Sequence, residues 1–301
     1  MDKSIFSEIL KNNGIGFTEN EPMKNRTTFR IGGAADFFVM PENEKELIFS
    51  VKSAIKCEIP YFIIGRGSNL LFDDAGYRGA VFSTEKLNNC KVSCGRIECG
   101  CGASFTAVSH VARDAGLTGL EFANGIPGYV GGAVYMNAGA YGGEVSDVLY
   151  SSTYYDTQKD EIETISLPEH EYGYRESVYI NNKGRIILSA VFELLPGNKD
   201  EIKAKMDDYM ERRRSKQPLE YPSAGSVFKR CEGHYTGQMI EELGLKGFSI
   251  GGAEISEKHA GFIINKNGAT SEDVLKLVSY ITAKVKEKYG LDLCREVIYV
   301  K

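Results

Sequence analysis

The sequence predicts a mixed protein of helices and strands with more than one domain. Its 301 residues exceed the usual size of a single hydrophobic core, so we expect two or three subdomains. Short apolar runs of strand length alternate with segments whose apolar residues recur at helical spacing. One stretch, 125–143, holds seven glycines in nineteen positions, which indicates a specialised loop.

Helices are predicted where apolar residues recur three and four positions apart. These residues are Leu47, Val51, Ala54 and Ile55 before Pro60; Phe105, Val108, Ala112 and Ala115 before Gly116; Ile202, Met206, Tyr209 and Met210; and Val274, Leu277, Val278, Ile281 and Val285. The last helix is expected to start at Thr270 or Ser271 and to end at Gly290. The third runs into the basic segment 211–216, which is either a solvated helix end or a positive lip for a phosphorylated substrate.

Strands are predicted in short apolar runs between these helices. The candidates are 36–40, 61–64, 80–83, a long and largely buried strand over 185–194, and a C-terminal strand over 294–300. Pro196 and Gly197 end the long strand, so a domain boundary is expected near 195–200.

The glycine-rich stretch 125–143 has two interpretations. A flexible linker is one, but linkers are rich in serine, proline or charge, whereas this stretch carries Ile126, Val130 and Val134, which need burial. Glycine is favoured where the chain takes positive φ or where a ligand lies against bare backbone. The stretch is therefore predicted to cradle a ligand.

A second glycine-bearing loop, 65–71, follows the apolar run 61–64. Consecutive N–H groups in such a turn can form an anion-binding nest, and Ser68 and Asn69 can add side-chain donors, so a phosphate or pyrophosphate fits here. The loop has neither the third glycine of a Rossmann fingerprint nor the Lys-Ser/Thr of a P-loop. Taken alone, it can equally be a β-turn between two strands.

The composition excludes several classes of function. A net charge of −5 argues against nucleic acid or an anionic membrane as the main partner. We expect a cytoplasmic protein, because the sequence has no signal-peptide pattern and no apolar run of membrane-spanning length. The seven cysteines have no zinc-site spacing and are expected to be free thiols, and the four scattered histidines are expected to be structural.

Three short polar segments hold the remaining candidate chemistry. Arg175 lies among aromatic residues, Ser226 follows a glycine, and Glu296 begins the apolar C-terminal run. An arginine can pair with a carboxylate or a developing oxyanion, and the glycine lets a ligand approach the serine. Each segment alone also has a structural interpretation, such as an ion pair or a turn.

In combination, these segments resemble the UDP-N-acetylmuramate dehydrogenase family, also called UDP-N-acetylenolpyruvoylglucosamine reductase or MurB, in its compact type II branch. The matching motifs keep a fixed order over residues 24–300. They are 26–36 (RTTFRIGGAAD), 65–71 (GRGSNLL), 119–128 (GLEFANGIPG), the glycine-rich stretch, Tyr174 with Arg175, and 224–229 (AGSVFK).

The resemblance implies an α+β protein with three parts. These are an N-terminal helical segment, 1–23; an FAD-binding domain of the vanillyl-alcohol-oxidase/PCMH type over 24–196, built from two α/β subdomains; and a C-terminal α+β substrate-binding domain over 197–301. FAD is expected to bind noncovalently between the glycine loops. The other expected partners are NADPH and the substrate, UDP-N-acetylglucosamine enolpyruvate, with no nucleic acid, membrane or metal, and the chain is expected to be a monomer.

The resemblance also implies a two-step reaction in peptidoglycan precursor synthesis. NADPH reduces FAD and leaves; flavin N5 then delivers hydride to C3 of the enolpyruvyl group, and C2 gains a proton to give UDP-N-acetylmuramate. Arg175 and a protonated Glu296 would stabilise the aci-carboxylate form of the substrate. Ser226 would be the acid that protonates C2.

Further site residues are carried over from the same motifs. The expected cofactor-binding residues are Ile64, Gly65, Arg66, Gly67, Ser68, Asn69, Leu70, Gly125, Ile126, Pro127, Gly128, Tyr129, Gly131, Gly132, Ala133, Asn137, Gly139 and Ala140. The expected substrate-binding residues are Tyr174, Arg214, Lys216 and Lys229, where Arg214 and Lys216 compete for one nucleotide-binding position.

The sequence departs from the family pattern at two positions. Tyr129 stands where the family usually has a small hydroxyl residue near the flavin pyrophosphate, and Ile298 stands where an arginine commonly follows the terminal Glu-Val. Two other classes share part of the pattern. An FAD-dependent alcohol or lactone oxidase would not need Ser226, Arg175 and Glu296 together, and a flavin-binding module without catalysis is the non-enzyme alternative.

Overall fold

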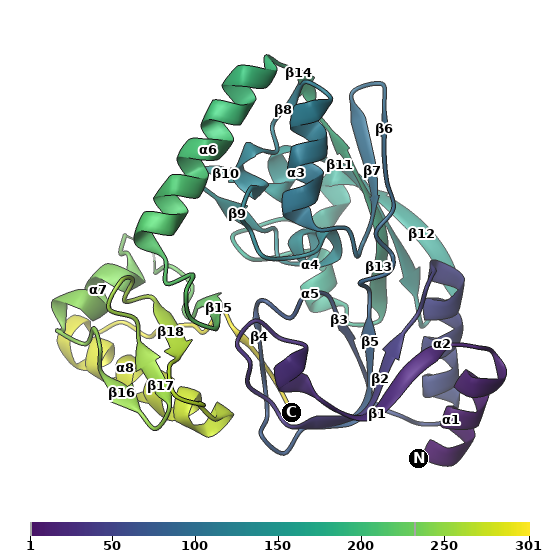
Figure 1. Cartoon of the computed structure of the whole chain (residues 1–301), viewed down its shortest axis with the longest axis horizontal. Helices are drawn as coiled ribbons and strands as arrows, with labels where there is room; N and C mark the ends of the chain where they lie inside the picture. The colour runs from purple at the N-terminus through teal and green to yellow at the C-terminus, as the bar shows by residue number, and fades with distance from the viewer. Residues whose placement is uncertain (1, 232) are drawn as a thin grey trace. The chain divides into compact units, whose positions relative to one another are not determined.

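The structure is a computed structural model that describes residues 2–231 and 233–301 (Figure 1). The chain forms two compact units, each assembled from several segments. Unit 1 comprises Met1–Thr18, Phe37–Arg66 and Gly79–Arg212, and unit 2 comprises Glu19–Asp36, Gly67–Arg78 and Arg213–Lys301. The boundaries expected at 23/24 and 196/197 divide the chain by function and stay a prediction.

The N-terminal part of the chain contains two helices and a four-stranded sheet. The elements are α1 (Lys3–Asn12), β1 (Gly16–Pro22), η1 (Met23–Asn25), β2 (Ala34–Met40), α2 (Glu44–Lys56), β3 (Tyr61–Ile64), β4 (Leu70–Phe72) and β5 (Tyr77–Ser83). The sheet has the order β1-β2-β5-β3, and β1, β2 and β5 each have residues in both units. The predicted strands 36–40, 61–64 and 80–83 and the predicted helix before Pro60 are confirmed.

The segment 1–23, expected to be helical, is only partly so. Its helix ends at Asn12, Gly14 takes a φ of 69°, and β1 follows from Gly16. The reason is local, because glycine reaches this left-handed conformation without the cost that a side chain would add.

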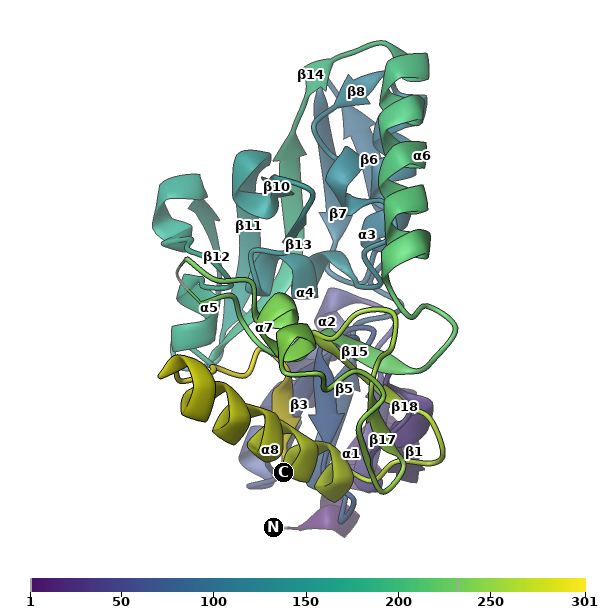
Figure 2. The ribbon, with the colours of Figure 1, turned by 90° about the vertical axis from the view of Figure 1, so that its left-hand side faces the viewer.

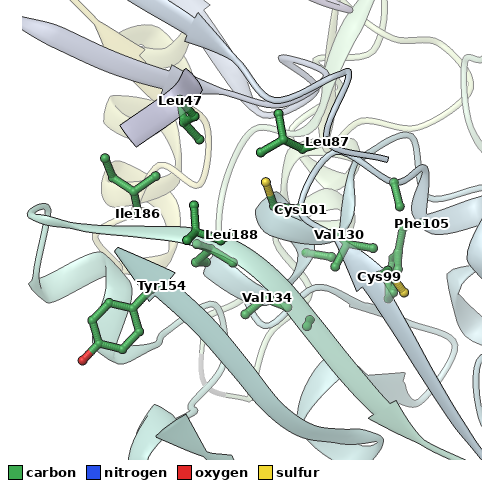
Figure 3. Packing of buried hydrophobic residues seen from close by; sticks show 14 of the residues in the cluster. Leu47, Leu87, Cys99, Cys101, Phe105, Val130, Val134, Tyr154, Ile186 and Leu188 are labelled. Atoms are coloured by element: carbon green, nitrogen blue, oxygen red, sulfur yellow. The ribbon is translucent and has the colours of Figure 1, made fainter. Parts of the chain in front are cut away.

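Unit 1 is centred on a five-stranded antiparallel sheet. Its strands are β6 (Cys90–Ser93), β7 (Arg96–Gly100), β11 (Leu149–Asp156), β12 (Glu161–Ser166) and β13 (Arg185–Glu193), in the order β12-β11-β13-β7-β6 (Figure 2). The central strand β13 is the long buried strand that the sequence predicts. The predicted helix before Gly116 is α3 (Phe105–Asp114), capped by Ser104. Side chains of β7, β13, α3 and α4 (Val130–Tyr135) meet in one core (Figure 3).

Short elements complete unit 1. They are β8 (Leu117–Thr118), η2 (Glu121–Ala123), β9 (Gly139–Ala140), β10 (Gly143–Glu144), η3 (Val145–Asp147), η4 (Leu167–His170), α5 (Val178–Asn181) and β14 (Leu195–Pro196). The long helix α6 (Lys199–Lys216), predicted from its apolar spacing, continues into unit 2. The glycine-rich stretch, predicted as a loop, thus contains the short helix α4 and the hairpin β9–β10.

Unit 2 contains an antiparallel sheet and two helices. Its elements are β15 (Ser223–Ser226), α7 (Thr236–Glu242), β16 (Ser249–Ile250), β17 (Ala253–Ile255), β18 (Phe262–Asn265), α8 (Ser271–Tyr289) and β19 (Ile298–Val300), and the sheet order is β15-β18-β17-β16. As predicted, α8 is capped by Thr270 and ended by Gly290, whose φ is 71°. The C-terminal strand starts at Ile298, later than predicted, and pairs in parallel with β4.

The remaining global predictions concern cysteines, metals and membranes. All seven cysteines are free thiols, as predicted. Within residues 2–231 and 233–301, histidine, cysteine and acidic side chains form no group that could hold a metal ion. None of the helices in this described part of the chain has the length and apolarity needed to cross a bilayer.

His170 is a fully buried structural histidine in unit 1, which agrees with the sequence-based expectation. Its Nδ1 lies 2.9 Å from the carbonyl oxygen of Ser166, which can only accept a hydrogen bond, so Nδ1 carries the proton. In the neutral ring Nε2 then has no proton, and it accepts from the hydroxyl of Ser152 at 2.7 Å. The Ser152 hydroxyl is in turn 2.6 Å from the hydroxyl of Tyr179. Burial lowers the pKa of His170 and holds the imidazole neutral.

Protein stability is expected to fall as the pH drops below about 6.5, because the unfolded chain binds a proton at His170 near that pH and the folded protein does not. Burial lowers the pKa of His259 as well, so its contribution has the same sign. His170→Gln removes one titrating group and should reduce the slope of the unfolding free energy against pH by up to about 1.4 kcal/mol per pH unit. Urea unfolding between pH 7.5 and 5 measures this slope, and an unchanged slope in the variant would contradict the assignment.

Candidate functional site

The glycine-rich stretch is held against the sheet of unit 1 by close backbone contacts. The N–H groups of Val130 and Gly131 donate to the carbonyls of Ala103 and Cys101 at 2.9 and 2.8 Å. A Cβ on Gly131 would lie 2.9 Å from the Cβ of Cys101, which is too close for a side chain. Val130 and Val134 point into the same core as Cys101 and Phe105 (Figure 3). The stretch is therefore a fixed structural element and not a flexible linker.

The outer side of this stretch presents backbone and apolar surface. Pro127 and Gly132 are exposed, and Gly125, Ile126 and Gly128 are half-buried. A Cβ on Gly132 would meet no protein atom within 4 Å. Bare backbone at a fixed, accessible position suits close contact with a ligand, and it fits the expected cofactor-binding role of this stretch.

Two residues that the sequence did not single out hold the start of the stretch. The hydroxyl of Thr106, on α3, accepts from the N–H of Gly125 and donates to the carbonyl of Ile126, both at 3.1 Å. The buried Asn124 donates from Nδ2 to the carbonyl of Met206 on α6 at 3.0 Å. These partners are remote in sequence, and no local pattern indicates them.

The first glycine loop begins beside the glycine-rich stretch in unit 1. A Cβ on Gly65 would lie 3.5 Å from Cδ2 of Tyr129, so the tyrosine ring covers this part of the backbone. Desolvation raises the pKa of Tyr129, the negative charge of nearby Glu85 adds to this rise, and the positive charge of Arg66 opposes it. The tyrosine that departs from the family pattern thus joins the start of one loop to the start of the other.

The rest of the first loop belongs to unit 2 and is tied to the C-terminal segment. Gly67 has a φ of 65° and its carbonyl accepts from the N–H of Thr28 at 3.3 Å. The side-chain amide of Asn69 donates to the backbone carbonyl of Glu296 at 3.2 Å, and its backbone carbonyl accepts from Ile298 at 3.0 Å. Asn69, expected to contact the cofactor, therefore positions the backbone of Glu296 and Ile298.

Arg175 lies against the glycine-rich stretch. Its Nη1 and Nη2 donate to the carbonyls of Asn137 and Gly139 at 3.1 and 3.2 Å, and its guanidinium lies 5.1 Å from the centre of the exposed Tyr174 ring. The residue has a φ of 56°, an unfavourable conformation for a side chain of this size. The structure thus places a fixed cation beside the stretch expected to bind the cofactor.

Asn137 stabilises the position of Arg175 through hydrogen bonds of its buried side chain. Its side chain is fully buried; Nδ2 donates to Oε1 of Glu144 at 3.0 Å and to the carbonyl of Gly173 at 3.1 Å, and Oδ1 accepts from the N–H of Ser146 at 2.9 Å. Its side-chain amide therefore links the stretch to the segment that carries Arg175, and its backbone carbonyl faces the guanidinium.

Ser226 reaches the surface of unit 2 because of a β-bulge. The strand partners are Ser223 with Ile264 and Ser226 with Phe262, so β15 contains one residue more than β18 between these pairs. Gly225, with a φ of 76°, takes up the extra residue. Regular alternation would bury Ser226 on the side of Ala224, whereas here Ser226 is exposed and Val227 is buried.

Glu296 lies beside Ser226 in the same unit. Its N–H donates to the carbonyl of Val227 at 2.8 Å, and the next pairing joins the N–H of Lys229 to the carbonyl of Cys294 at 2.8 Å. The Glu296 side chain is half-buried. This pairing explains why β19 starts only at Ile298, because the residues before it are used by the segment that follows Ser226.

The other expected substrate-binding residues lie at the surface of the structure. Arg214 and Lys216 are exposed in the last turn of α6, and Lys229 is half-buried. Lys216 lies close enough to His259 to lower its pKa, although burial is the larger cause. Arg213, which the sequence did not single out, is the buried arginine of this turn and donates to Oε1 of Gln217 at 3.1 Å.

The expected residues therefore fall into two groups. Unit 1 brings together Gly65, Arg66, the glycine-rich stretch, Tyr174 and Arg175, whereas unit 2 brings together Asn69, Ser226, Lys229 and Glu296. One group offers backbone and a cation, and the other offers a hydroxyl, a carboxyl group and a lysine.

Two family models match the chain. Residues 35–165 match an FAD-binding domain, and residues 217–300 match the C-terminal domain of UDP-N-acetylenolpyruvoylglucosamine reductase. The glycine-rich stretch and most of unit 1 lie in the first match, and Ser226 and Glu296 lie in the second.

Curated relatives extend this likeness over nearly the whole chain. The chain is 46% identical to UDP-N-acetylenolpyruvoylglucosamine reductase of Clostridium perfringens over 280 residues, covering 93% of this chain and 91% of the relative. It is 48% identical to the enzyme of the same name from Staphylococcus aureus over 278 residues, covering 92% and 90%.

A solved structure shows the same fold. UDP-N-acetylenolpyruvylglucosamine reductase (MurB) from Thermus caldophilus matches with a TM-score of 0.81 at 31% identity, over 95% of this chain and 99% of that one. This match and the FAD-binding domain confirm the predicted fold class, an α+β protein with an FAD-binding domain of the vanillyl-alcohol-oxidase type. The chain is an FAD-dependent oxidoreductase and belongs to the UDP-N-acetylenolpyruvoylglucosamine reductase family.

Proposed function

We propose that the protein reduces UDP-N-acetylglucosamine enolpyruvate to UDP-N-acetylmuramate with NADPH as the electron donor. The observation that carries this proposal is the backbone pairing of Glu296 with Val227 at 2.8 Å, which keeps the carboxyl group of Glu296 and the hydroxyl of Ser226 on neighbouring segments. A hydroxyl and a carboxyl group on neighbouring segments suit a reaction that protonates carbon next to a carboxylate.

Residues 65–70 and 125–140 would hold FAD noncovalently. The accessible backbone at Pro127 and Gly132 fits a flat ligand, and the N–H groups of such glycine loops favour an anion such as a pyrophosphate. When bound, FAD accepts hydride from NADPH and passes it to C3 of the enolpyruvyl group. By this proposal, residues 24–196 bind the cofactor and residues 197–301 bind the substrate.

Arg175 would bind the substrate carboxylate and stabilise its aci-carboxylate form. The guanidinium already lies on the carbonyls of Asn137 and Gly139, so it needs little reorganisation to face a second, negatively charged partner. Preorganised donors of this kind lower the energy of a developing oxyanion.

Ser226 would donate its hydroxyl proton to C2. The bulge at Gly225 exposes the hydroxyl and fixes its direction, so that it can lie close to the reacting carbon. A serine is a weak acid, and it transfers a proton only because the carbanionic form of the substrate is a strong base.

Glu296, in its protonated form, would donate a hydrogen bond to the same carboxylate. Lys229, beside these groups, and Arg214 or Lys216, in the last turn of α6, would bind the phosphates of the nucleotide. Tyr174 would pack against the substrate beside Arg175.

One anaerobic experiment tests the proposed reaction. NADPH should bleach the flavin of the purified protein, and UDP-N-acetylglucosamine enolpyruvate should then restore the oxidised flavin spectrum without oxygen. Bleached flavin that does not reoxidise with this substrate would overturn the proposed function.

Gly132→Ala tests the cofactor-binding backbone. The new methyl group meets no protein atom within 4 Å, so the flavin-free protein should keep its stability or gain up to about 1 kcal/mol of helix propensity. A ligand packed on this backbone would lose about 1 to 3 kcal/mol of binding energy, so the Kd for FAD should rise roughly 5- to 150-fold. Titration of FAD into flavin-free protein measures this change. In the control Gly16→Ala, where the nearest atom would be 3.9 Å away, the Kd should not change.

Ser226→Ala should separate the two halves of the reaction. Reduction of the flavin by NADPH should stay near the wild-type rate, whereas reoxidation by the enolpyruvyl substrate should slow by about 10² to 10⁴, the usual contribution of a general acid. Stopped-flow measurement of each half-reaction distinguishes them, with Ser223→Ala in the same strand as the control. Equal losses in both halves would show that Ser226 has a structural role.

Glu296→Gln should retain more activity than Glu296→Ala. A glutamine amide can still donate a hydrogen bond to the developing aci-carboxylate, whereas alanine cannot. Loss of such a donor costs about 3 to 4 kcal/mol in the transition state, so the alanine variant should fall by roughly 10² to 10³. Single-turnover reoxidation of the flavin compares the two, and indistinguishable rates would exclude the donor role.

A further inference from the structure

Two cysteines face each other across the hairpin at the edge of the unit 1 sheet. Strands β6 and β7 are joined by the two-residue turn Cys94-Gly95, in which both residues have positive φ, 49° and 75°. Turns of this kind fix the register of a hairpin. In this register, Cys90 lies directly opposite Cys99.

The position of this pair in the hydrogen-bond ladder brings the two thiols close. The N–H of Gly100 donates to the carbonyl of Asn89 at 2.9 Å, so Cys90 and Cys99 form a pair without direct backbone hydrogen bonds between them. In antiparallel sheets such pairs have the shorter Cα separation, about 4.5 Å, which lies within the range that a disulfide spans. Each thiol is also near enough to shift the pKa of the other.

The two cysteines have unequal environments. Cys90 is exposed on the edge strand, whereas Cys99 is fully buried in the core of unit 1. The neighbouring Cys99 thiol lowers the pKa of Cys90 to about 7, whereas the interaction with Cys90 and burial raise the pKa of Cys99. An accessible thiolate beside a shielded thiol is the arrangement of an attacking cysteine with a resolving partner.

We propose that Cys90 and Cys99 form a redox modification site, in which a small-molecule disulfide such as glutathione disulfide converts the two thiols into a reversible cross-strand disulfide. The Cys90 thiolate attacks one sulfur of glutathione disulfide; a mixed disulfide forms and one glutathione thiolate leaves. That thiolate takes the proton of Cys99, and the Cys99 sulfur then attacks the Cys90 sulfur. The Cys90–Cys99 bond forms, and the second glutathione leaves and takes a proton from water. Two protein thiols are thus oxidised, and one glutathione disulfide is reduced to two thiols.

The neighbouring cysteines do not offer the same geometry. Cys94 is exposed in the turn itself, and Cys101 is buried beyond the end of β7, where desolvation raises its pKa to about 12. Cys90 and Cys99 belong to the edge hairpin and take no part in the proposed reduction of the substrate. The modification can therefore be tested independently of activity.

The test is a mass-spectrometric analysis of the flavin-containing protein after exposure to glutathione disulfide at neutral pH. Trypsin cleaves after Lys91 and Arg96, so Cys90, Cys94 and the pair Cys99/Cys101 fall on three different peptides. We expect a protein lighter by two hydrogen atoms, with two fewer free thiols, in which peptide 87–91 is joined to peptide 97–113. Fragmentation should place the bond on Cys99, and dithiothreitol should restore both thiols.

Two variants at exposed positions complete the test. Cys90→Ser should abolish the cross-link, and Cys94→Ser should leave it unchanged, because only Cys90 lies opposite Cys99. Glutathione that stays attached to Cys90 with no cross-link, or a bond from Cys90 to any cysteine other than Cys99, would overturn the proposal.

Discussion

The arrangement of unit 1 depends on one close approach between two backbones, the hydrogen bond from Gly131 to the carbonyl of Cys101 at 2.8 Å. Only a residue without Cβ allows this distance, because a side chain at position 131 would collide with Cys101. The bond fixes the start of α4 against the residue that follows β7. As a result, Val130 and Val134 are buried while the backbone on the other side stays accessible. The surface offered to a ligand is thus a consequence of how the sheet is packed.

In unit 2, the position of Ser226 depends on one extra residue in strand β15. The bulge in β15 shifts the alternation of side chains, so that Ser226 is exposed in a strand whose regular pattern would bury it. The segment after the bulge then pairs with Cys294 and Glu296, and Asn69 holds the carbonyl of Glu296 from the other side. Three segments that are remote in sequence therefore fix the backbone that carries the carboxyl group of Glu296.

The sequence predicts the helices and strands that depend mainly on residues close together in the chain. The helices α2, α3, α6 and α8 follow from apolar spacing, and Thr270 and Gly290 mark the ends of α8. The short helix α4 was missed because glycine disfavours helices, and burial of its apolar face against the sheet overrides that preference. The late start of β19 was also missed, because it depends on pairing with a segment almost seventy residues earlier.

The sequence indicates some residues of the candidate site and gives no sign of others. Arg175, Ser226 and Glu296 were singled out from short polar segments and from the family resemblance, and their catalytic roles stay a prediction. Thr106 and Asn124 carry no such signal, since their partners lie on other elements.

The left-handed conformations of Asn137, Tyr141 and Arg175 also cannot be predicted from the sequence. Each such residue costs about 1 to 3 kcal/mol, and the structure keeps it only where other contacts compensate. Asn137 has three side-chain hydrogen bonds of 3.1 Å or shorter, Tyr141 stacks on Tyr209 with ring centres 4.7 Å apart, and Arg175 binds two carbonyls. Each of these residues therefore has contacts that compensate its strain, and at Arg175 the same contacts fix the guanidinium.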